Sequence, residues 1–249
     1  MNYGFFRVAA ASLKLKVANP SYNKEEIKKA IDAALQEDVR LLVTPELSIT
    51  GYTCADLFFT KALQNAAKEA LEDIAAYTKG KNIVVIVGAP YKCKNKLFNC
   101  AYTLCDGEVK LITPKSNIAN YNEFYEKRWF VSGENAEAFS NLYQCAVDSK
   151  FELCDGVMIG IELCEDLWVP NPPSSQLALD GANIIVNLSA SDEYVSKAMY
   201  RRDLVANQSA RCICGYVYAG ASVYESTTDL VFSGATTVSY THLTLPTNS

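Results

Sequence analysis

The sequence predicts an α/β domain with a mixed β-sheet, and three observations carry this prediction. Apolar runs that are typical of buried strands alternate with segments whose apolar residues recur at helical spacing. The run Leu41-Leu42-Val43 has no polar interruption, as expected of a strand that is covered on both faces. The dipeptide Asp106-Gly107 separates two strand-like runs and indicates a hairpin, so the sheet contains antiparallel pairs as well as parallel ones.

The elements follow in order from these patterns. The first half of the chain predicts strand 5–13, helix 21–37, strand 40–44, helix 56–79, strand 82–89, and a hairpin of strands 97–105 and 108–113. A polar and aromatic loop over residues 114–133 comes next, and then a second hairpin over residues 141–153. The second half predicts a strand that begins at residue 156 and ends at a turn with Cys164, followed by helix 174–180, strand 182–188, helix 194–212 and strand 215–221. Because no internal repeat or linker is visible, we expect one domain.

Composition excludes several classes of protein. The 249 residues are 49% hydrophobic, enough for a full core. The net charge is −5 and the basic residues are scattered, which argues against a nucleic-acid partner. The chain shows neither a run of roughly 20 apolar residues, as a membrane span needs, nor the pattern of a signal peptide. We therefore expect no membrane partner and a cytoplasmic location.

The cysteines and the histidine narrow the chemistry. The nine cysteines include no Cys-x-x-Cys pair, so neither a zinc site nor a disulfide framework is expected. The single histidine, His242, lies near the end of the chain. Catalysis of the Ser-His-Asp or Cys-His type is therefore excluded unless that end folds back into a site. A cysteine nucleophile in this chain would need a carboxylate as its base.

The stretch from Gly160 to Trp168 carries the candidate nucleophile. An apolar strand precedes it and prolines follow it, so Cys164 is expected on a tight turn at a strand end. Catalytic nucleophiles often occupy such turns, where the side chain projects into a cleft. The alternative is a buried structural cysteine beside solvated acids.

Two further polar residues follow predicted strands. Glu46 comes after strand 40–44, and Lys115 comes after the Asp-Gly hairpin. Ligands of α/β sheets bind outside such strand ends. A buried carboxylate can take the proton of a thiol, and an ammonium can lower the pKa of that thiol and stabilise an oxyanion. Taken singly, a glutamate after a proline, such as Glu46, is more often a loop residue, and a lysine such as Lys115 is more often a solvated hairpin flank.

Together these segments resemble a known family. The following motifs are similar to the signature segments of the nitrilase superfamily: Thr44-Pro-Glu-Leu47 with Gly51-Tyr52, Lys115 with Tyr121-Asn-Glu-Phe-Tyr-Glu-Lys-Arg-Trp-Phe130, and Leu163-Cys-Glu-Asp-Leu-Trp168. More narrowly, the second and third segments, with Asn187-Leu-Ser-Ala-Ser191 and Glu225-Ser-Thr-Thr-Asp-Leu-Val-Phe-Ser-Gly234, resemble the amino-terminal glutaminase domain of glutamine-dependent NAD synthetases.

The resemblance implies a four-layer α-β-β-α sandwich with mixed sheets that self-associates into a homo-oligomer. It implies a catalytic triad of Glu46, Lys115 and Cys164, with Glu126 as a supporting carboxylate that orients Lys115. The substrate would be L-glutamine, in a pocket lined by Tyr121, Glu165, Ser191 and Lys197. Ammonia released through a cysteine thioester would feed the ATP-dependent amidation of deamido-NAD to NAD. No metal or cofactor is implied for this domain, since ATP and magnesium belong to the synthetase domain.

The likeness runs from the first strand to Gly234. We therefore expect residues 1–238 to form a carbon–nitrogen hydrolase domain that is incomplete at its carboxyl end, with the synthetase domain missing, and residues 239–249 to be a foreign or disordered tail. Two alternatives stay open at this stage. One is a free-standing amidase or nitrilase that acts on another amide, and the other is a non-catalytic assembly module.

Overall fold

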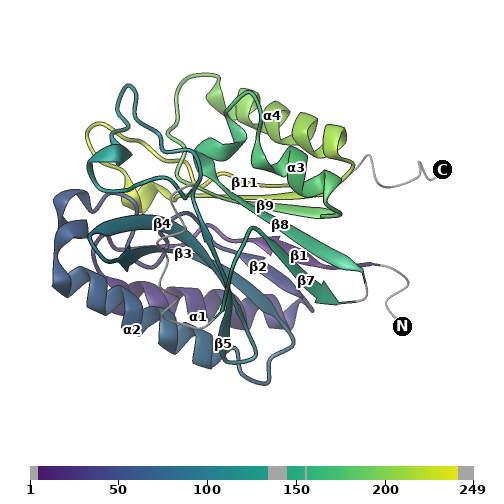
Figure 1. Cartoon of the computed structure of the whole chain (residues 1–249), viewed down its shortest axis with the longest axis horizontal. Helices are drawn as coiled ribbons and strands as arrows, with labels where there is room; N and C mark the ends of the chain where they lie inside the picture. Colours follow the sequence, from purple (N-terminus) through teal and green to yellow (C-terminus); the bar gives the residue numbers. More distant parts are fainter. Residues whose placement is uncertain (1–4, 134–144, 155, 241–249) are drawn as a thin grey trace.

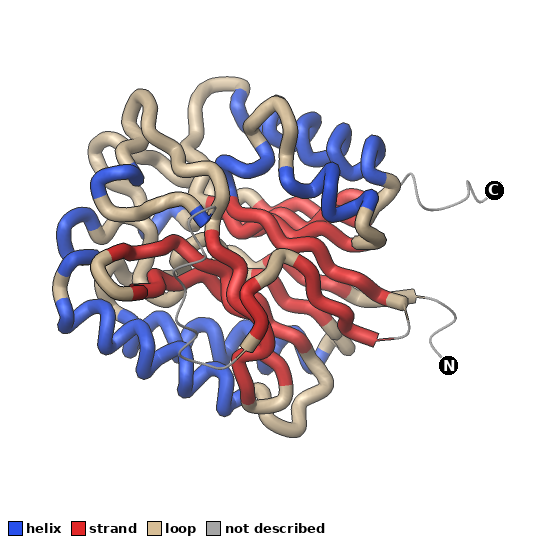
Figure 2. The backbone as a smooth tube through the Cα atoms, in the orientation of Figure 1, coloured by secondary structure: helices blue, strands red, loops and turns tan. Residues whose placement is uncertain are grey.

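The computed structural model describes residues 5–133, 145–154 and 156–240. Two β-sheets pack face to face, and a pair of helices covers the outer face of each sheet (Figure 1). The predicted four-layer sandwich is thereby confirmed. Figure 2 shows the same layers as strands between two helical layers.

Within the described residues, six strands form the first sheet in the order β1-β2-β3-β4-β5-β6. They are β1 (Val8–Ala10), β2 (Leu41–Val43), β3 (Val84–Cys93), β4 (Lys96–Cys105), β5 (Glu108–Pro114) and β6 (Ala146–Val147). The pairs β1–β2, β2–β3 and β5–β6 are parallel, and β3–β4 and β4–β5 are antiparallel. Its outer face carries α1 (Pro20–Gln36) and α2 (Lys61–Tyr77).

Five described strands form the second sheet in the order β11-β10-β9-β8-β7. They are β7 (Lys150–Cys154), β8 (Val157–Leu163), β9 (Ile184–Ser189), β10 (Gly215–Gly220) and β11 (Thr236–Ser239). The strands β8, β9 and β10 run parallel, and the two outer strands are antiparallel to their neighbours. Its outer face carries α3 (Pro173–Leu179) and α4 (Lys197–Cys212).

The strand β2 shows why the apolar residues produce layers. Leu41 and Val43 point into the core between the two sheets, whereas Leu42 points into the core under α1 and α2. Successive side chains of a strand face opposite sides of its sheet, so a strand with both faces covered needs three apolar residues in a row. The expectation drawn from this run is confirmed.

Helix α1 begins where the sequence predicts. Asn19 caps it, since its side-chain oxygen accepts a hydrogen bond from the N–H of Tyr22 at 3.1 Å, and Pro20 occupies the first turn. Ile27 and Ile31, one helical turn apart, are fully buried. The amphipathic pattern therefore directs this helix onto the first sheet.

Two predicted elements differ from the structure. The predicted helix 56–79 is divided into a short 3₁₀ helix, η1 (Ala55–Phe59), and α2, because Thr60 lies in the extended region and caps α2. The predicted hairpin over residues 141–153 is wrong in its described part. β6 pairs with β5 of the first sheet, whereas β7 pairs with β8 of the second. Residues 141–144 lie outside the described residues.

The last described strand crosses the predicted boundary at residue 238. β11 pairs antiparallel with β10, and the carbonyl of Ser239 accepts a hydrogen bond from the hydroxyl of Ser209 at 3.0 Å. The strand therefore includes the first residue of the expected tail, whose residues 241–249 lie outside the described residues.

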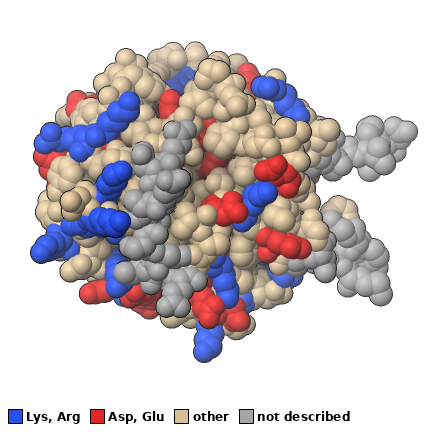
Figure 3. Space-filling model, viewed as in Figure 1, with Lys and Arg blue, Asp and Glu red and all other residues tan. Residues whose placement is uncertain are grey.

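The charged side chains on the surface are scattered, as the sequence indicated. Acidic and basic side chains are interspersed on the face that Figure 3 shows. None of the helices in the described ranges has the length and apolar character that a membrane crossing requires.

Candidate active site

The three residues predicted at strand ends lie beside the interface of the two sheets. Glu46 follows β2, Lys115 directly follows β5, and Cys164 directly follows β8. The first two belong to the first sheet and the third to the second sheet. Their side chains are buried, with 0%, 0% and 4% of their surface exposed. A polar group is rarely buried so completely unless it is paired, so these residues need partners.

Lys115 lies between two carboxylates. Its ammonium Nζ is 2.8 Å from Oε1 of Glu46 and donates to both carboxylate oxygens of Glu126, at 2.8 and 2.9 Å. Glu126 begins a short 3₁₀ helix, η2 (Glu126–Arg128), and is 1% exposed. The structure thus places Glu126 where the sequence predicts it, against the Lys115 side chain.

The carboxylate of Glu46 has one occupied oxygen and one open oxygen. Oε1 accepts hydrogen bonds from Lys115 and from the side-chain amide of Asn99, the latter at 2.7 Å. Oε2 is buried and has no hydrogen-bond partner among the described residues. The nearby Cys164 thiol slightly lowers the pKa of this carboxyl. Because Oε1 is occupied, Oε2 is the oxygen available to a proton from the thiol.

Cys164 adopts a strained backbone conformation. Its φ is +43°, a region that side chains other than glycine rarely occupy. Its N–H donates to the side-chain oxygen of Asn187 at 3.1 Å, and the carboxylate of Asp166 accepts from the N–H of Leu163 at 2.9 Å. These bonds hold the turn from β8 into the 3₁₀ helix η4 (Cys164–Leu167). The tight turn predicted from the sequence is confirmed.

The first turn of η4 also supplies a donor. The first N–H groups of a helix have no acceptor within the helix. Cys164 gives its own N–H to Asn187, so the N–H of Glu165 is the next along the chain beside the thiol. A developing oxyanion on a carbonyl attacked by the thiol would lie near this N–H and the Lys115 ammonium.

Burial sets the protonation of the pair Glu46 and Lys115. Burial raises the pKa of Glu46 to about 7, against the opposing charge of Lys115, and the charge of Glu126 raises it further. For Lys115, burial alone would lower the pKa, but Glu126 and Glu46 outweigh it and raise the pKa well above its usual value. The lysine is therefore a cation, and Glu46 exchanges its proton near neutral pH.

Opposing influences set the pKa of the Cys164 thiol. Burial, and then the charge of Glu46, raise the pKa of Cys164 well above its usual value, although Lys115 lowers it. The Lys115 ammonium acts in the expected direction, but desolvation outweighs it in the unliganded site. The thiol needs a base at the moment of reaction, and Glu46 is placed to serve as one.

The four predicted pocket residues come from four segments: the aromatic loop (Tyr121), η4 (Glu165), the residues after β9 (Ser191) and the first residue of α4 (Lys197). Tyr121 donates its hydroxyl proton to Oε2 of Glu165 at 2.8 Å. Lys197 forms an ion pair with Asp192, and its ammonium lies 5.3 Å from the centre of the Trp168 ring. Tyr121 and Lys197 line one open hollow of about 400 Å³, together with Trp168, Asp192 and Tyr194 among others.

Ser191 is 9% exposed and lies just after β9, and Tyr218 stands on the neighbouring strand β10. Tyr218 donates to the hydroxyl of Ser189 at 2.6 Å, and Ser189 lowers the pKa of the Cys164 thiol slightly against the larger effect of burial. Ser191 thus lies just beyond β9, the strand that pairs with the β8 strand leading to Cys164. The structure brings Tyr121, Glu165 and Lys197 to the open side and Ser191 to the buried side.

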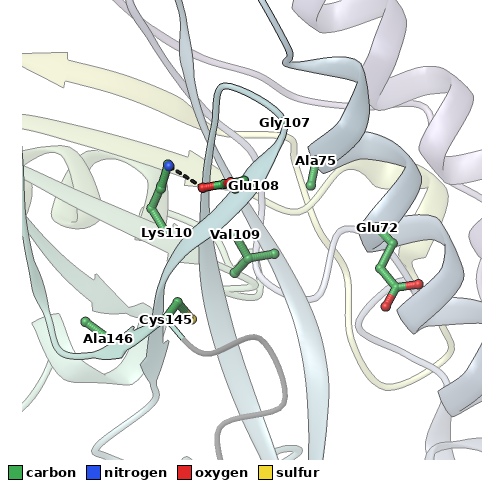
Figure 4. A pocket seen from close by; sticks show the side chains of 8 residues that line it. All are labelled: Glu72, Ala75, Gly107, Glu108, Val109, Lys110, Cys145 and Ala146. Carbon is green, nitrogen blue, oxygen red and sulfur yellow. Dashed lines mark hydrogen bonds and ion pairs between the residues drawn. The ribbon is translucent and has the colours of Figure 1, made fainter.

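A larger hollow lies away from these residues. It measures about 710 Å³ and is lined by Glu72 of α2, by Glu108 and Lys110 of β5, and by neighbouring residues (Figure 4). The ion pair of Glu108 and Lys110 crosses its rim. None of the predicted site residues lines it, and its ionisable side chains are exposed. Size alone therefore does not mark the site.

Sequence reasoning missed three buried partners of the site. Asn99 lies within β4, where no motif marked it. Tyr52 donates its hydroxyl proton to Glu126 at 2.6 Å, and its N–H donates to the Glu225 carboxylate at 2.8 Å. Both residues stand in segments that carried the resemblance, which was the available signal. Among the described residues, no group of three or more His, Cys, Asp and Glu side chains is arranged to hold a metal ion.

Comparison with known proteins identifies the family. The family model described as carbon–nitrogen hydrolase matches residues 7–239. The glutamine-dependent NAD(+) synthetase of Mycobacterium tuberculosis is 35% identical over 242 residues, which are 95% of this chain and 36% of the relative. That of Aquifex aeolicus is 29% identical over 228 residues, which are 92% of this chain and 37% of the relative. The chain thus spans little more than a third of the length of these relatives.

Superposition on solved structures supports the same family. A glutamine-dependent NAD(+) synthetase from Cytophaga hutchinsonii superposes with a TM-score of 0.83 at 29% identity, over 95% of this chain and 39% of that chain. An amidase from Nesterenkonia sp. superposes with a TM-score of 0.75 at 21% identity, over 94% of this chain and 81% of that chain, and supports the fold alone. The resemblance drawn from the motifs is confirmed, and the family match over residues 7–239 shows that this chain belongs to the carbon–nitrogen hydrolase family.

Proposed function

We propose that this chain hydrolyses the side-chain amide of L-glutamine and releases ammonia. One observation carries the proposal: the buried carboxylate of Glu46 and the buried ammonium of Lys115 are in contact beside a cysteine on a strained turn. The set supplies a nucleophile, a base and an electrostatic stabiliser, which is what amide hydrolysis through a covalent intermediate needs.

In the first half-reaction, Glu46 accepts the thiol proton of Cys164 as the sulfur attacks the side-chain carbonyl carbon of glutamine. A carbon–sulfur bond forms, and the carbonyl electron pair moves to the oxygen. Lys115 and the N–H of Glu165 stabilise this oxyanion. When the intermediate collapses, the carbon–nitrogen bond breaks, Glu46 gives its proton to the nitrogen, and ammonia leaves.

In the second half-reaction, water attacks the glutamyl thioester. Glu46, now a carboxylate again, accepts a proton from the water and later returns it to the sulfur. The products are glutamate and the free thiol. A pKa of about 7 suits a group that must both accept and donate a proton near neutral pH.

The open hollow fits the amino-acid end of glutamine. Of the residues that line the hollow, Lys197 offers a cation for the α-carboxylate and Asp192 a carboxylate for the α-ammonium. Glu165, bound to Tyr121 of the hollow's wall, offers a second carboxylate. Tyr121 stands between Glu165 and the hollow, and its ring covers the substrate's methylene groups. Ser191 completes the buried wall near the thiol.

The relatives' names suggest where the ammonia goes. We propose that it is consumed in the ATP-dependent amidation of deamido-NAD by a synthetase domain, where ATP and magnesium would bind. Ammonia is diffusible and protonatable, so it is used best when the two domains are held together. The proposal also includes a cytoplasmic location and a homo-oligomer.

The test is product release by the purified chain. Glutamate and ammonia should form from glutamine in equal amounts, acetamide and propionamide should react far more slowly, and the Cys164→Ala variant should form neither product. Faster turnover of the short amides would instead indicate a general amidase. No turnover of any amide, together with a thiol at position 164 that resists glutamine-like electrophiles, would indicate a non-catalytic assembly module.

A further inference from the structure

Glu225 is a buried carboxyl that the proposed mechanism does not use. It ends the 3₁₀ helix η5 (Val223–Glu225) and is fully buried. Oε2 accepts one hydrogen bond, Oε1 has no partner, and no cation pairs with this group, within the described residues. A buried carboxyl so poorly paired costs stability, and such a cost is usually tolerated where the group has a role.

Glu225 makes two contacts with a segment that is more than 170 residues away in the chain. Its Oε2 accepts the N–H of Tyr52 at 2.8 Å, and its backbone carbonyl accepts the hydroxyl of Thr53 at 2.8 Å. Gly51 permits this approach. Its φ is +82°, and a Cβ there would lie 3.2 Å from the backbone of Val17 and 3.5 Å from the Glu225 carboxylate.

The contacted segment leads directly to the catalytic cluster. The N–H of Gly51 donates to the carbonyl of Leu47 at 2.8 Å, so the turn that follows Glu46 closes on the same segment. On the other side, the hydroxyl of Tyr52 donates to Glu126 at 2.6 Å, and Glu126 holds Lys115. One residue therefore fixes the backbone from which both Glu46 and the partner of Lys115 are oriented.

We propose that Glu225 is a positioning residue for the reaction, acting through Tyr52 on Glu126 and Lys115. The inference rests on the proposed function for its kinetic consequences, but the geometry that carries it is independent of the substrate. Glu225 touches neither the thiol nor the open hollow, so it should affect the rate of the chemical step and leave glutamine binding unchanged.

The neutral form of Glu225 is compatible with this role. Burial raises its pKa to about 7, whereas the hydrogen bond from Tyr52 lowers it and the charge of Glu46 raises it. An amide at this position keeps an oxygen that can accept the N–H of Tyr52. The Glu225→Gln substitution should therefore preserve the link, and Glu225→Ala should remove it.

The experiment compares Glu225→Ala and Glu225→Gln with the matched control Asp229→Asn, an exposed carboxylate on the same segment. Two quantities are measured: kcat and KM for glutamine, and the rate at which iodoacetamide alkylates Cys164, followed by mass spectrometry of the peptide that carries it. We expect Glu225→Ala to lower kcat about 10- to 100-fold with KM within twofold, in line with the loss of a positioning contact. Alkylation should also slow, because a displaced Lys115 no longer favours the thiolate.

The Gln variant and the control should stay within twofold of the wild type in both quantities. Equal losses in the Ala and Gln variants, or an Ala variant with wild-type kcat and alkylation rate, would overturn the proposal. If the wild type releases no glutamate, the proposed function fails, while the alkylation rates still decide the role of Glu225.

Tyr52→Phe provides a second test should Glu225→Ala fold poorly. It removes the hydroxyl that reaches Glu126 and keeps the N–H that reaches Glu225. Its partner in this test is Glu225→Asp, whose shorter side chain draws the carboxylate back from Tyr52. We expect the two single variants to lose similar amounts of kcat. The double variant Tyr52→Phe/Glu225→Asp should lose no more than twice as much as the weaker single variant. Fully multiplicative losses would show that the two residues act separately and would contradict the proposal.

Discussion

Lys115 and Glu46 form an ion pair of 2.8 Å in which neither side chain is exposed to solvent. The same ammonium binds Glu126, so a single cation serves two buried carboxylates. Water is absent from such a site as a screening medium, so the charges act on a bound substrate more strongly than they would at the surface. The pair is therefore the electrostatic centre of the site.

Removing the cation should cost both activity and stability. Lys115→Met leaves the two carboxylates without a counterion, and breaking a buried pair in this way typically costs about 3–5 kcal/mol. The turnover rate should fall by at least about 10²–10³-fold, the usual loss for one oxyanion donor. Lys110→Met, at the surface of the strand β5 that Lys115 follows, is the matched control. Steady-state kinetics and urea denaturation give the two numbers, and a variant as active as the control would rule out Lys115 as the stabiliser.

Asn99 should act on Glu46 alone. Its side-chain amide occupies Oε1 at 2.7 Å, and its backbone carbonyl accepts the N–H of Lys115 at 2.8 Å. Asn99→Leu keeps the backbone bond and removes the side-chain donor, so Glu46 gains freedom to turn Oε1 toward the thiol. We expect kcat to fall about 10- to 100-fold with KM unchanged, since a hydrogen bond to a charged group contributes about 1.5–3 kcal/mol. Asn65→Leu, on the exposed face of α2, should be neutral. A change confined to KM would contradict this role.

Gly88 should be intolerant of any side chain. A Cβ there would lie 2.3 Å from the backbone nitrogen of Leu47 and 2.9 Å from the carbonyl of Pro45, so the turn that carries Glu46 would have to move. Gly88→Ala should lower stability by about 1–3 kcal/mol, as overpacking does, and reduce activity further by displacing Glu46. Gly215→Ala is the control, because a Cβ there meets no atom closer than 3.9 Å. Equal melting temperatures of the two variants would show that the turn after β2 accommodates the added methyl group without loss of stability.

Glu162 predicts a measurable pH dependence of stability. Burial raises its pKa to about 7, although Tyr216 and Ser174 donate hydrogen bonds to it. The folded carboxyl thus keeps its proton up to about pH 7, whereas the unfolded one releases it near pH 4.5. Between these values the folded state binds more protons, so this group makes the free energy of unfolding fall as pH rises, and its contribution is constant above the window.

Glu162→Gln should remove that fall. The amide can accept from Ser174 and donate to Tyr216, and it does not ionise. We expect the variant to gain up to about 3 kcal/mol over the wild type at pH 8 and little at pH 4.5. Denaturant titrations across this range measure it, with Glu152→Gln on the exposed neighbouring strand as control. An equal difference at both pH values would show that Glu162 does not titrate in the window.

The sequence predicted what local patterns encode. Leu41–Val43 is apolar at every position and could only be a covered strand, and Asp106-Gly107 placed the turn between β4 and β5. The short runs of β6 and β7 carried no information on which sheet they join, because sheet membership depends on contacts with β5 and β8. A hairpin was the simplest local solution, and it was wrong.

The site residues also include some that local sequence patterns predicted and some that they did not. Glu46, Lys115 and Cys164 could be selected because each follows a strand, a position visible in the sequence. Their supports could not be selected from the chain itself. Asn99 lies 53 residues from Glu46 and inside a strand, and Glu225 lies 173 residues from Tyr52. Such partners come together only when the strands pair into sheets and the sheets pack, since no spacing rule connects residues so far apart in the chain.

The proposed reaction depends most on Cys164 as the nucleophile for a glutamine-like substrate. The direct test is mass spectrometry of the chain after treatment with 6-diazo-5-oxo-norleucine, which carries the amino-acid end of glutamine and an electrophilic carbon at the position of the amide. We expect one label per chain, on Cys164. Glutamine should protect Cys164 from labelling, and Glu46→Gln should slow the labelling strongly. A label on any of the other eight cysteines, or no label under conditions that leave the protein folded, would contradict it.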